Sequence, residues 1–315
     1  MSGYKRSTIR RIIRHKLDKF FASILDDDLR DRMKRDTLVT GGAISSMLLG
    51  EKVNDYDIYF KTKETTVDVA KYFVAQFNTL RSGADAVLYE PAVKEEGDRI
   101  LIHMQSAGVA GAKQEPYRYF EAQAPSLTDD FAASLTSPDA DELGKVEEVV
   151  ELVKTPKHEY KPVFLTDNAI TLTDRVQIII RFYGSPEEIH HNFDFVHCMG
   201  VYDYVADTLI LPPALMESCL SKTLVYNGSV YPMASILRTR KFLRRGWRIG
   251  AGQMIKMMHQ ISGLDLEDPN VLKEQLMGVD VAYMHQLITA LQNREPGQRI
   301  DSTYLAAIID TIFED

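Results

Sequence analysis

The sequence predicts an α/β fold, in which a small mixed sheet with packed helices is followed by a mainly helical C-terminal domain. Two observations predict it. Short strand-like apolar runs alternate with helical periodicity up to about residue 205, and the pattern from there to residue 315 is almost entirely helical. A chain of 315 residues that is 45% hydrophobic and 26% charged also has enough apolar residues for one large or two medium-sized cores.

The first elements follow from periodicity and turn residues. Apolar residues at helical spacing predict a helix over 7–25. The stretch "TLVTGG" (37–42) predicts a short strand that ends in a glycine turn, and "AISSMLLG" (43–50) predicts a short helix with Gly50 just after its end. The run "DYDIYF" (55–60) predicts a strand.

The later elements are expected in a strand-rich block and a helical block. After a helix over 65–80 and a strand over 99–105, we expect strand, turn and strand at "AITLTDRVQIIIRF" (169–182), "GSPEEIHH" (184–191) and "NFDFVHC" (192–198). The helical block is expected over residues 212–226, 233–247, 252–264, 268–279, 280–292 and 302–313.

These elements predict three regions along the chain. Residues 1–35 are expected to form an N-terminal helical arm, residues 36–205 the sheet-containing catalytic domain, and residues 206–315 the helical domain. A stretch near 106–160 is rich in Ala, Ser, Pro, Asp and Glu and lacks sustained periodicity. We interpret it as an insertion with one helix, flanked by loops.

The overall charge and the cysteines narrow the class of protein. The formal net charge of −8 argues against a simple basic nucleic-acid binder, although a local basic patch is compatible with it. Cys198 and Cys219 have no metal-type spacing and are expected to be reduced thiols. The sequence has neither the apolar core of a secretory signal nor a run of about 18 apolar residues that would span a membrane. These features predict a cytoplasmic protein.

Two acidic residues on one predicted strand are the candidate catalytic pair. Side chains two apart on a strand point the same way, about 7 Å apart along the chain, so Asp55 and Asp57 are expected to face one side together. Two such carboxylates repel each other unless a cation lies between them. Mg²⁺ prefers oxygen ligands, and a pair of these ions would support an in-line phosphoryl displacement. The spacing therefore predicts a site for two Mg²⁺ ions, with Mn²⁺ as an alternative.

A two-metal site of this kind calls for a third carboxylate from a neighbouring strand. Asp194 is the preferred candidate because a lone acid between two phenylalanines on a central strand is costly unless it is paired or bound to metal. Asp174, at the start of a strand, and Asp203, beyond a strand end, are the alternatives.

The glycines upstream of the acid pair predict a phosphate site. Gly41 and Gly42 stand at a strand-to-helix junction, where the backbone can approach a phosphate and the helix start offers free N–H groups. Ser45 and Ser46 could add hydroxyl donors to a triphosphate.

The motif formed by these residues resembles the DNA polymerase β-type nucleotidyltransferase superfamily. Within it, "VTGGAISSMLLGEKVNDYDIYF" (39–60) is similar to the head of tRNA CCA-adding enzymes and poly(A) polymerases. The matching positions are Gly41, Gly42, Leu48, Leu49, Gly50, Asp55 and Asp57. A second segment, "ILRTRKFLRRGW" (236–247), is similar to a basic helix of those enzymes, and the chain as a whole resembles nucleotidyltransferases encoded by tailed bacteriophages.

The resemblance implies a function. It implies transfer of a nucleoside monophosphate from an NTP to a hydroxyl, with an RNA 3′ end, tRNA in particular, as the expected acceptor. Arg238, Lys241 and Arg245 are expected on one helix face, where they would bind nucleotide or acceptor phosphate. A protein or small-molecule hydroxyl, or an inactive nucleotide-binding protein, remains an alternative. The Glu-Asp-x-x-Arg element that reads the base in CCA-adding enzymes is replaced here by "PMASILR".

Overall fold

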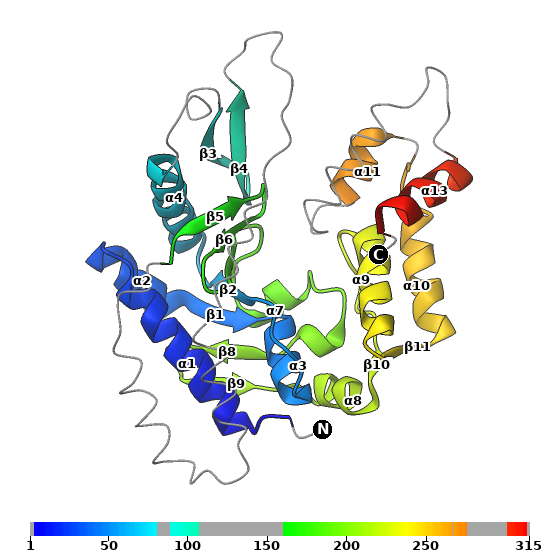
Figure 1. Cartoon of the computed structure of the whole chain (residues 1–315), viewed down its shortest axis with the longest axis horizontal. Coiled ribbons are helices and arrows are strands. Elements are labelled where there is room, and N and C mark those ends of the chain that lie inside the picture. The colour runs from blue at the N-terminus through cyan, green and yellow to red at the C-terminus, as the bar shows by residue number, and fades with distance from the viewer. Residues whose placement is uncertain (1–2, 81–88, 107–159, 267, 276–300, 314–315) are drawn as a thin grey trace. The chain divides into compact units, whose positions relative to one another are not determined.

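The computed structural model describes residues 3–80, 89–106, 160–266, 268–275 and 301–313, and the chain divides into two compact units (Figure 1). Unit 1 comprises residues 1–186 and 200–210, and unit 2 comprises residues 187–199 and 211–315. The predicted insertion near 106–160, apart from its two end residues, and the helix predicted over 280–292 lie outside the described residues.

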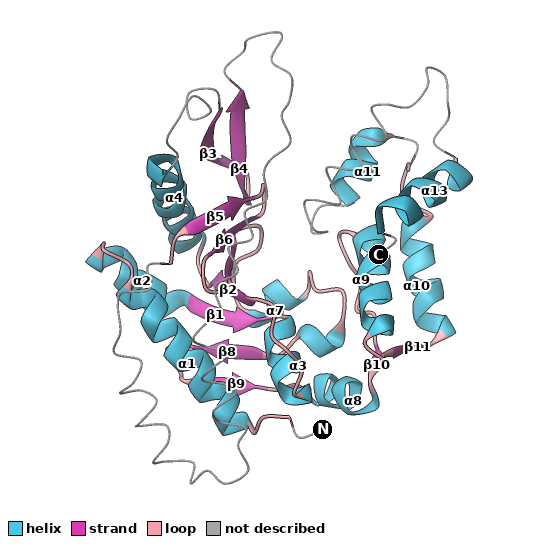
Figure 2. Cartoon of the chain, viewed as in Figure 1, coloured by secondary structure: helices cyan, strands magenta, loops and turns pink. Residues whose placement is uncertain are grey.

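Unit 1 is built on a seven-stranded mixed sheet with the strand order β5-β6-β7-β2-β1-β8-β9 (Figure 2). Only the pairing of β2 with β7 is parallel, and the other neighbouring strands of this sheet are antiparallel. The strands are β1 (Thr37–Thr40), β2 (Tyr56–Phe60), β5 (Pro162–Leu165), β6 (Ala169–Leu172), β7 (Val176–Ile179), β8 (Val201–Asp203) and β9 (Thr208–Ile210). This sheet with its helices confirms the predicted mixed α/β fold.

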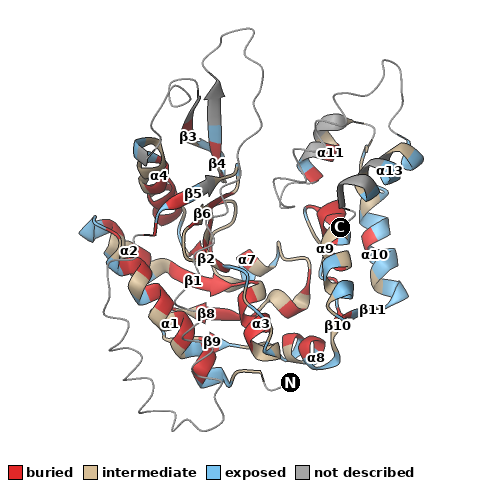
Figure 3. Cartoon of the chain, in the orientation of Figure 1, coloured by how far each residue is buried: buried red, intermediate tan, exposed pale blue. Residues whose placement is uncertain are grey.

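Burial explains why these segments form the sheet. Every residue of β1 is buried, as are four of the five residues of β2, and Figure 3 shows the same for most of β8. Apolar and β-branched residues fill these strands, as expected for strands covered on both faces. The single strand predicted over 169–182 is wrong, because β6 and β7 form a hairpin there with a turn at residues 173–175. The predicted run "RVQIII" (175–180) contains β7, an interior strand of the sheet.

The N-terminal helices belong to unit 1. Helix α1 (Arg6–Ala22) buries the apolar residues that the periodicity predicted, among them Ile9, Ile13 and Phe20. Its polar residues bind the turn that follows β8, because Arg14 Nη1 donates to the carbonyl oxygen of Tyr204 at 2.9 Å. Helix α2 (Asp27–Asp36) follows it, with Asp26 as its N-cap. The predicted N-terminal arm is therefore part of the body of unit 1.

A helix and a hairpin complete unit 1. Helix α4 (Lys63–Leu80) and strand β4 (Arg99–Ser106) confirm the elements predicted over 65–80 and 99–105. Strand β4 pairs with β3 (Tyr89–Glu96) in a separate two-stranded sheet, and α4 packs against β3.

The structure contradicts the prediction at residues 184–198. A short helix, α7 (Pro186–His190), replaces the predicted turn, and the predicted strand over 192–198 is wrong. That segment has a single β-bridge, from Phe195 to Tyr226, followed by the 3₁₀ helix η2 (Val196–Cys198). Phe195 is fully buried against the rings of Tyr226 and Phe242. Its apolar side chain therefore belongs to an aromatic cluster of unit 2 and not to a strand of the sheet.

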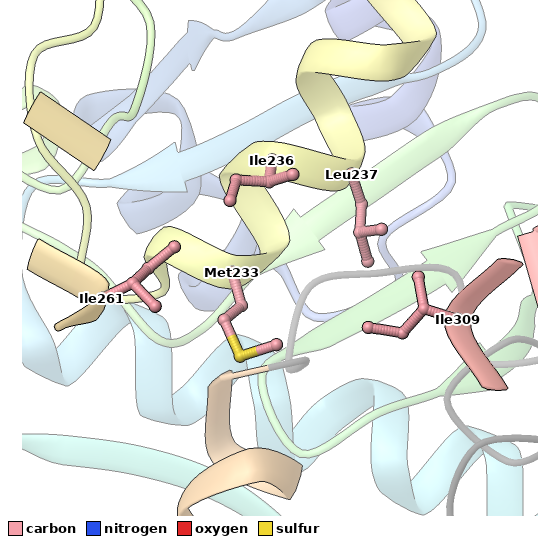
Figure 4. A pocket seen from close by; sticks show the side chains of 5 residues that line it. All are labelled: Met233, Ile236, Leu237, Ile261 and Ile309. Carbon is pink, nitrogen blue, oxygen red and sulfur yellow. The ribbon is translucent and has the colours of Figure 1, made fainter. Parts of the chain in front are cut away.

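Unit 2 is mainly helical, as predicted. Its longer elements are α8 (Pro213–Ser221), α9 (Pro232–Arg244), α10 (Ala251–Ile261), α11 (Pro269–Gln275) and α13 (Ser302–Phe313), with a two-stranded parallel pair, β10 (Thr223–Leu224) and β11 (Arg248–Ile249). Aliphatic and methionine side chains of α9, α10 and α13 line an apolar cavity of about 170 Å³, shown in Figure 4. None of the described helices is both long and apolar enough to cross a membrane.

Candidate active site

The turn between β1 and α3 (Gly42–Leu49) lies directly against one of the predicted catalytic acids. Gly41 connects strand and helix with φ 104° and ψ −159°, a conformation that residues with a Cβ rarely adopt. A Cβ placed on Gly41 would lie 2.5 Å from Oδ2 of Asp57. The pairing of Thr40 with Asp57 across β1 and β2 brings the two segments together. Gly41 is therefore required both by its backbone angles and by the carboxylate beside it.

The acid pair lies where the sequence predicts it, at the start of β2. Asp55 is exposed and immediately precedes the strand, and Asp57 is half-buried within it, between the buried residues Tyr56 and Ile58. The strand is held at this end by the backbone N–H of Tyr56, which donates to the carbonyl oxygen of Arg175 at 2.7 Å. Two carboxylates at the start of a rigid strand are well placed to hold cations.

The predicted phosphate ligands differ in their surroundings. A Cβ on Gly42 would meet no atom within 4 Å, so the first turn of α3 has open space beside its backbone. Ser45 and Ser46 are both buried, and the Ser45 hydroxyl donates to the carbonyl oxygen of Gly42 at 3.0 Å. The backbone N–H groups at the start of α3 are thus better placed for an anion than the Ser45 hydroxyl. At the other end of α3, Gly50 adopts the left-handed conformation expected of a C-terminal glycine.

Asp194, the predicted third acid, lies in unit 2 and not on a strand of the sheet. It sits in a bend, where its Oδ2 accepts a hydrogen bond from Arg238 Nε at 2.6 Å. The backbone is fixed there by Asn227, whose N–H donates to the carbonyl oxygen of Asp194 at 2.8 Å. A charge-assisted hydrogen bond of this length is a strong local contact.

The alternative third acids are engaged elsewhere in unit 1. Asp174 accepts hydrogen bonds from the buried Lys16 and from the hydroxyl of Tyr160, each at 3.0 Å. Asp203 pairs with Lys61 at 2.7 Å and caps the turn that follows β8. Both contacts are structural, since they hold α1 and the strand ends in place.

The basic residues predicted on one helix face are on or next to α9 of unit 2. Arg238 is the partner of Asp194, Lys241 is exposed, and Arg245 follows the last residue of the helix as its C-cap. The helix ends where Gly246 takes φ 79° and the backbone N–H of Trp247 returns to the carbonyl oxygen of Phe242. The predicted helix over 233–247 is thereby confirmed up to Arg244.

A buried histidine lies three residues after Asp194. The ring of His197 is 1% exposed and packs against Phe242 and Trp247, with centroid distances of 4.5 and 4.3 Å. Burial lowers the pKa of His197 to about 4, and the nearby Arg245 acts in the same direction while Asp194 opposes it. His197 is therefore a neutral core residue at pH 7.

The pKa of His197 predicts a pH dependence of stability. The unfolded chain takes up a proton at this residue below its usual pKa near 6.5, whereas the folded protein does so only near 4. Stability is therefore expected to fall as the pH drops from 6.5 towards 4, by up to about 1 kcal/mol per pH unit from this group. Urea unfolding of the wild type and of His197→Phe at pH 7, 5.5 and 4.5 measures it. Equal slopes for both proteins would contradict the prediction.

The donor set at the acid pair is compatible with a hard divalent cation. Asp55 and Asp57 offer carboxylate oxygens, which Mg²⁺ prefers. Among the described residues there is no group of three or more His, Cys, Asp or Glu side chains that could hold a metal ion. A cation at this pair would need further oxygen ligands, as a triphosphate provides.

Comparisons with known proteins place the chain in a family. Residues 11–222, two thirds of the chain, match the model of the Gabija anti-defense 2 protein family. A protein named Gabija anti-defense 2 from Bacillus phage SPbetaL7 is 25% identical over 107 residues, which are 33% of this chain and 27% of that protein. The match thus spans little more than a quarter of the relative's length.

Solved structures of tRNA-processing enzymes are similar at low identity. The Bacillus stearothermophilus CCA-adding enzyme in complex with CTP is 14% identical with a TM-score of 0.37, over 87% of this chain and 51% of that one. The Thermotoga maritima CCA-adding enzyme complexed with tRNA is 11% identical with a TM-score of 0.38, over 93% and 68% of the two chains. On the family match over residues 11–222, this chain belongs to the Gabija anti-defense 2 protein family.

Proposed function

We propose that this protein is a metal-dependent nucleotidyltransferase, which moves a nucleoside monophosphate from an NTP to a hydroxyl acceptor and releases pyrophosphate. The contact between Gly41 and Asp57 carries the proposal. It joins an anion-binding helix start to a carboxylate pair, and a triphosphate with its cations requires both. The residue match to the nucleotidyltransferase motif at positions 41–57 supports the same reaction.

The proposed roles follow from the positions of these residues. Asp55 and Asp57 hold two Mg²⁺ ions, with Mn²⁺ as an alternative, and the backbone of Gly41 and Gly42 binds the β- and γ-phosphates. Ions held there would stabilise the negative charge on the attacking and leaving oxygens. The protein itself positions the triphosphate against the acid pair, which accounts for much of the expected rate.

Asp194 is retained as the proposed third acid. It lies outside the sheet and is paired with Arg238. The substitution Asp194→Asn tests its role. If Asp194 takes part in the reaction, Asp194→Asn lowers turnover without changing the Kd for NTP. If it serves only to hold Arg238, the variant lowers the stability of the protein instead.

The charge of unit 2 supports a polyanionic acceptor such as an RNA 3′ end. Residues 218–264 contain eight Lys and Arg residues and no Asp or Glu, in a chain whose net charge is −8. Lys241 is exposed within this stretch, and Arg238 and Arg245 are half-buried. Such a basic segment attracts phosphate backbones in a salt-dependent manner.

The family membership favours a second candidate acceptor. A family named for anti-defence against Gabija suggests a target within that bacterial defence. Transfer of the nucleoside monophosphate to a hydroxyl of a defence protein would use the same site and the same chemistry. The reaction class is thus common to both candidates, and only the acceptor differs.

The experiment that tests the proposal follows the label from the NTP. The protein is incubated with each α-³²P-labelled NTP, Mg²⁺, and lysate of cells that carry the Gabija defence. We expect a labelled macromolecular product that Asp57→Asn does not form. Sensitivity of the product to RNase identifies an RNA acceptor, and sensitivity to protease identifies a protein. Absence of a labelled product with all four NTPs would contradict the proposed function.

A further inference from the structure

We propose that Gln177 is a further member of the site, a neutral amide at the place on β7 where a third carboxylate would stand. This proposal rests on the proposed function. Its consequence is that the sheet supplies two negative charges instead of three. Unit 1 then binds its full set of cations only together with the triphosphate.

The strand register places Gln177 beside Asp57 in the sheet. Strand β7 runs parallel to β2 with Asp57 opposite Gln177, and antiparallel to β6 with Thr171 opposite Gln177. On the other side of β2, Asp57 lies opposite Thr40. Directly paired residues of neighbouring strands point to the same face and are separated by about 4.8 Å. Thr171, Gln177, Asp57 and Thr40 therefore form one row across four strands.

Burial shows that this row opens to solvent at Asp57, Gln177 and Thr171 and is buried at Thr40. Gln177 is half-exposed between the buried residues Val176 and Ile178, and Asp57 is half-exposed between Tyr56 and Ile58. The side chain of Gln177 makes no hydrogen bond or ion pair with other described residues. Gln177 thus shares the face of the sheet with its paired residue Asp57, and its amide is accessible to a ligand.

The chemistry of the amide decides what this position does. Glutamine has the shape of glutamate, but its carbonyl oxygen is a neutral ligand and its NH₂ group is a hydrogen-bond donor. The other two members of the row, Thr40 and Thr171, are not acidic. Two carboxylates balance at most one divalent cation, so a second cation needs the negative charge of a triphosphate.

The test measures binding of Mn²⁺ by electron paramagnetic resonance, with the metal alone and with a non-hydrolysable NTP analogue. For the wild type we expect weak binding of Mn²⁺ alone and tighter binding with the analogue. Gln177→Glu adds a charged ligand beside Asp57 and is expected to lower the Kd for Mn²⁺ alone by about tenfold. Gln177→Leu is expected to raise the Kd for Mn²⁺ in the presence of the analogue. This second variant keeps the test decisive if Gln177→Glu does not fold.

The control places the same charge elsewhere in unit 1. Leu25 is 84% exposed in the loop between α1 and α2, and Leu25→Glu should leave Mn²⁺ binding at the wild-type level. Unchanged Mn²⁺ affinity in both Gln177 variants would overturn this inference, whether or not the wild type binds the metal. The proposed function fails on a different result, namely a Kd for Mn²⁺ with the analogue that Asp57→Asn does not change.

Discussion

Asp57→Asn is expected to lower the rate of nucleotidyl transfer by roughly a hundred- to a thousandfold, as is usual when one preorganised electrostatic group is removed. The substitution keeps the shape of the side chain and removes its charge. Asp57 is half-buried on β2 with Gly41 against its Oδ2, so an isosteric amide should leave the fold intact. The rate of label transfer and the melting temperature are measured on the same preparation.

The effect of Asp57→Asn has a matched control in the same unit. Asp31 lies on α2 with its side chain 63% exposed, so Asp31→Asn removes one carboxylate without touching the site. We expect wild-type activity from this variant. Asp55→Asn should behave as Asp57→Asn does. Full activity in either site variant would show that the acid pair does not hold the cations that the reaction needs.

Gly41→Ala is expected to reduce both stability and activity. The positive-φ backbone of Gly41 costs an alanine about 1–3 kcal/mol, and the alanine Cβ would lie 2.5 Å from Oδ2 of Asp57. Either the turn or the carboxylate has to move, and a shift of about 1 Å at a reacting centre can lower the rate on the order of a hundredfold. Urea unfolding and label transfer measure the two effects.

The adjacent glycine provides the control for Gly41→Ala. A Cβ on Gly42 meets no atom within 4 Å, so Gly42→Ala should unfold at or above the wild-type urea concentration. A double-mutant cycle with Asp57 separates the backbone strain of Gly41→Ala from the clash of its Cβ with the carboxylate. Because Asp57→Ala removes the colliding carboxylate, Gly41→Ala should cost less stability in that background, by on the order of 1 kcal/mol. Equal costs in both backgrounds would show that the carboxylate is not in contact with the turn.

Local patterns predicted the elements that carry the site. The run 37–60 alternates a short apolar strand, a glycine turn, a capped helix and a second strand, and each of these signals is contained within a few residues. The left-handed Gly50 and the buried apolar face of α1 were likewise readable, because a turn residue and helical spacing are local properties.

The prediction at residues 192–198 was wrong for a reason that no local pattern reveals. Phe193 and Phe195 alternate with Asp194 as residues of a strand do, yet Phe195 packs onto Tyr226 and Phe242, which are distant in sequence. The short strands β8 and β9 were missed, since three-residue strands are too short to show a period.

The sequence by itself determined the mixed α/β class, the glycine turn and the acid pair, because neighbours in the chain form them. Only the tertiary structure decided which residues stand beside that pair. Strand register placed Gln177 opposite Asp57, and ion pairs engaged Asp174 with Lys16 and Asp194 with Arg238. The pairing of β2 with β7 joins residues more than a hundred positions apart, and residue spacing along the chain carries no record of it.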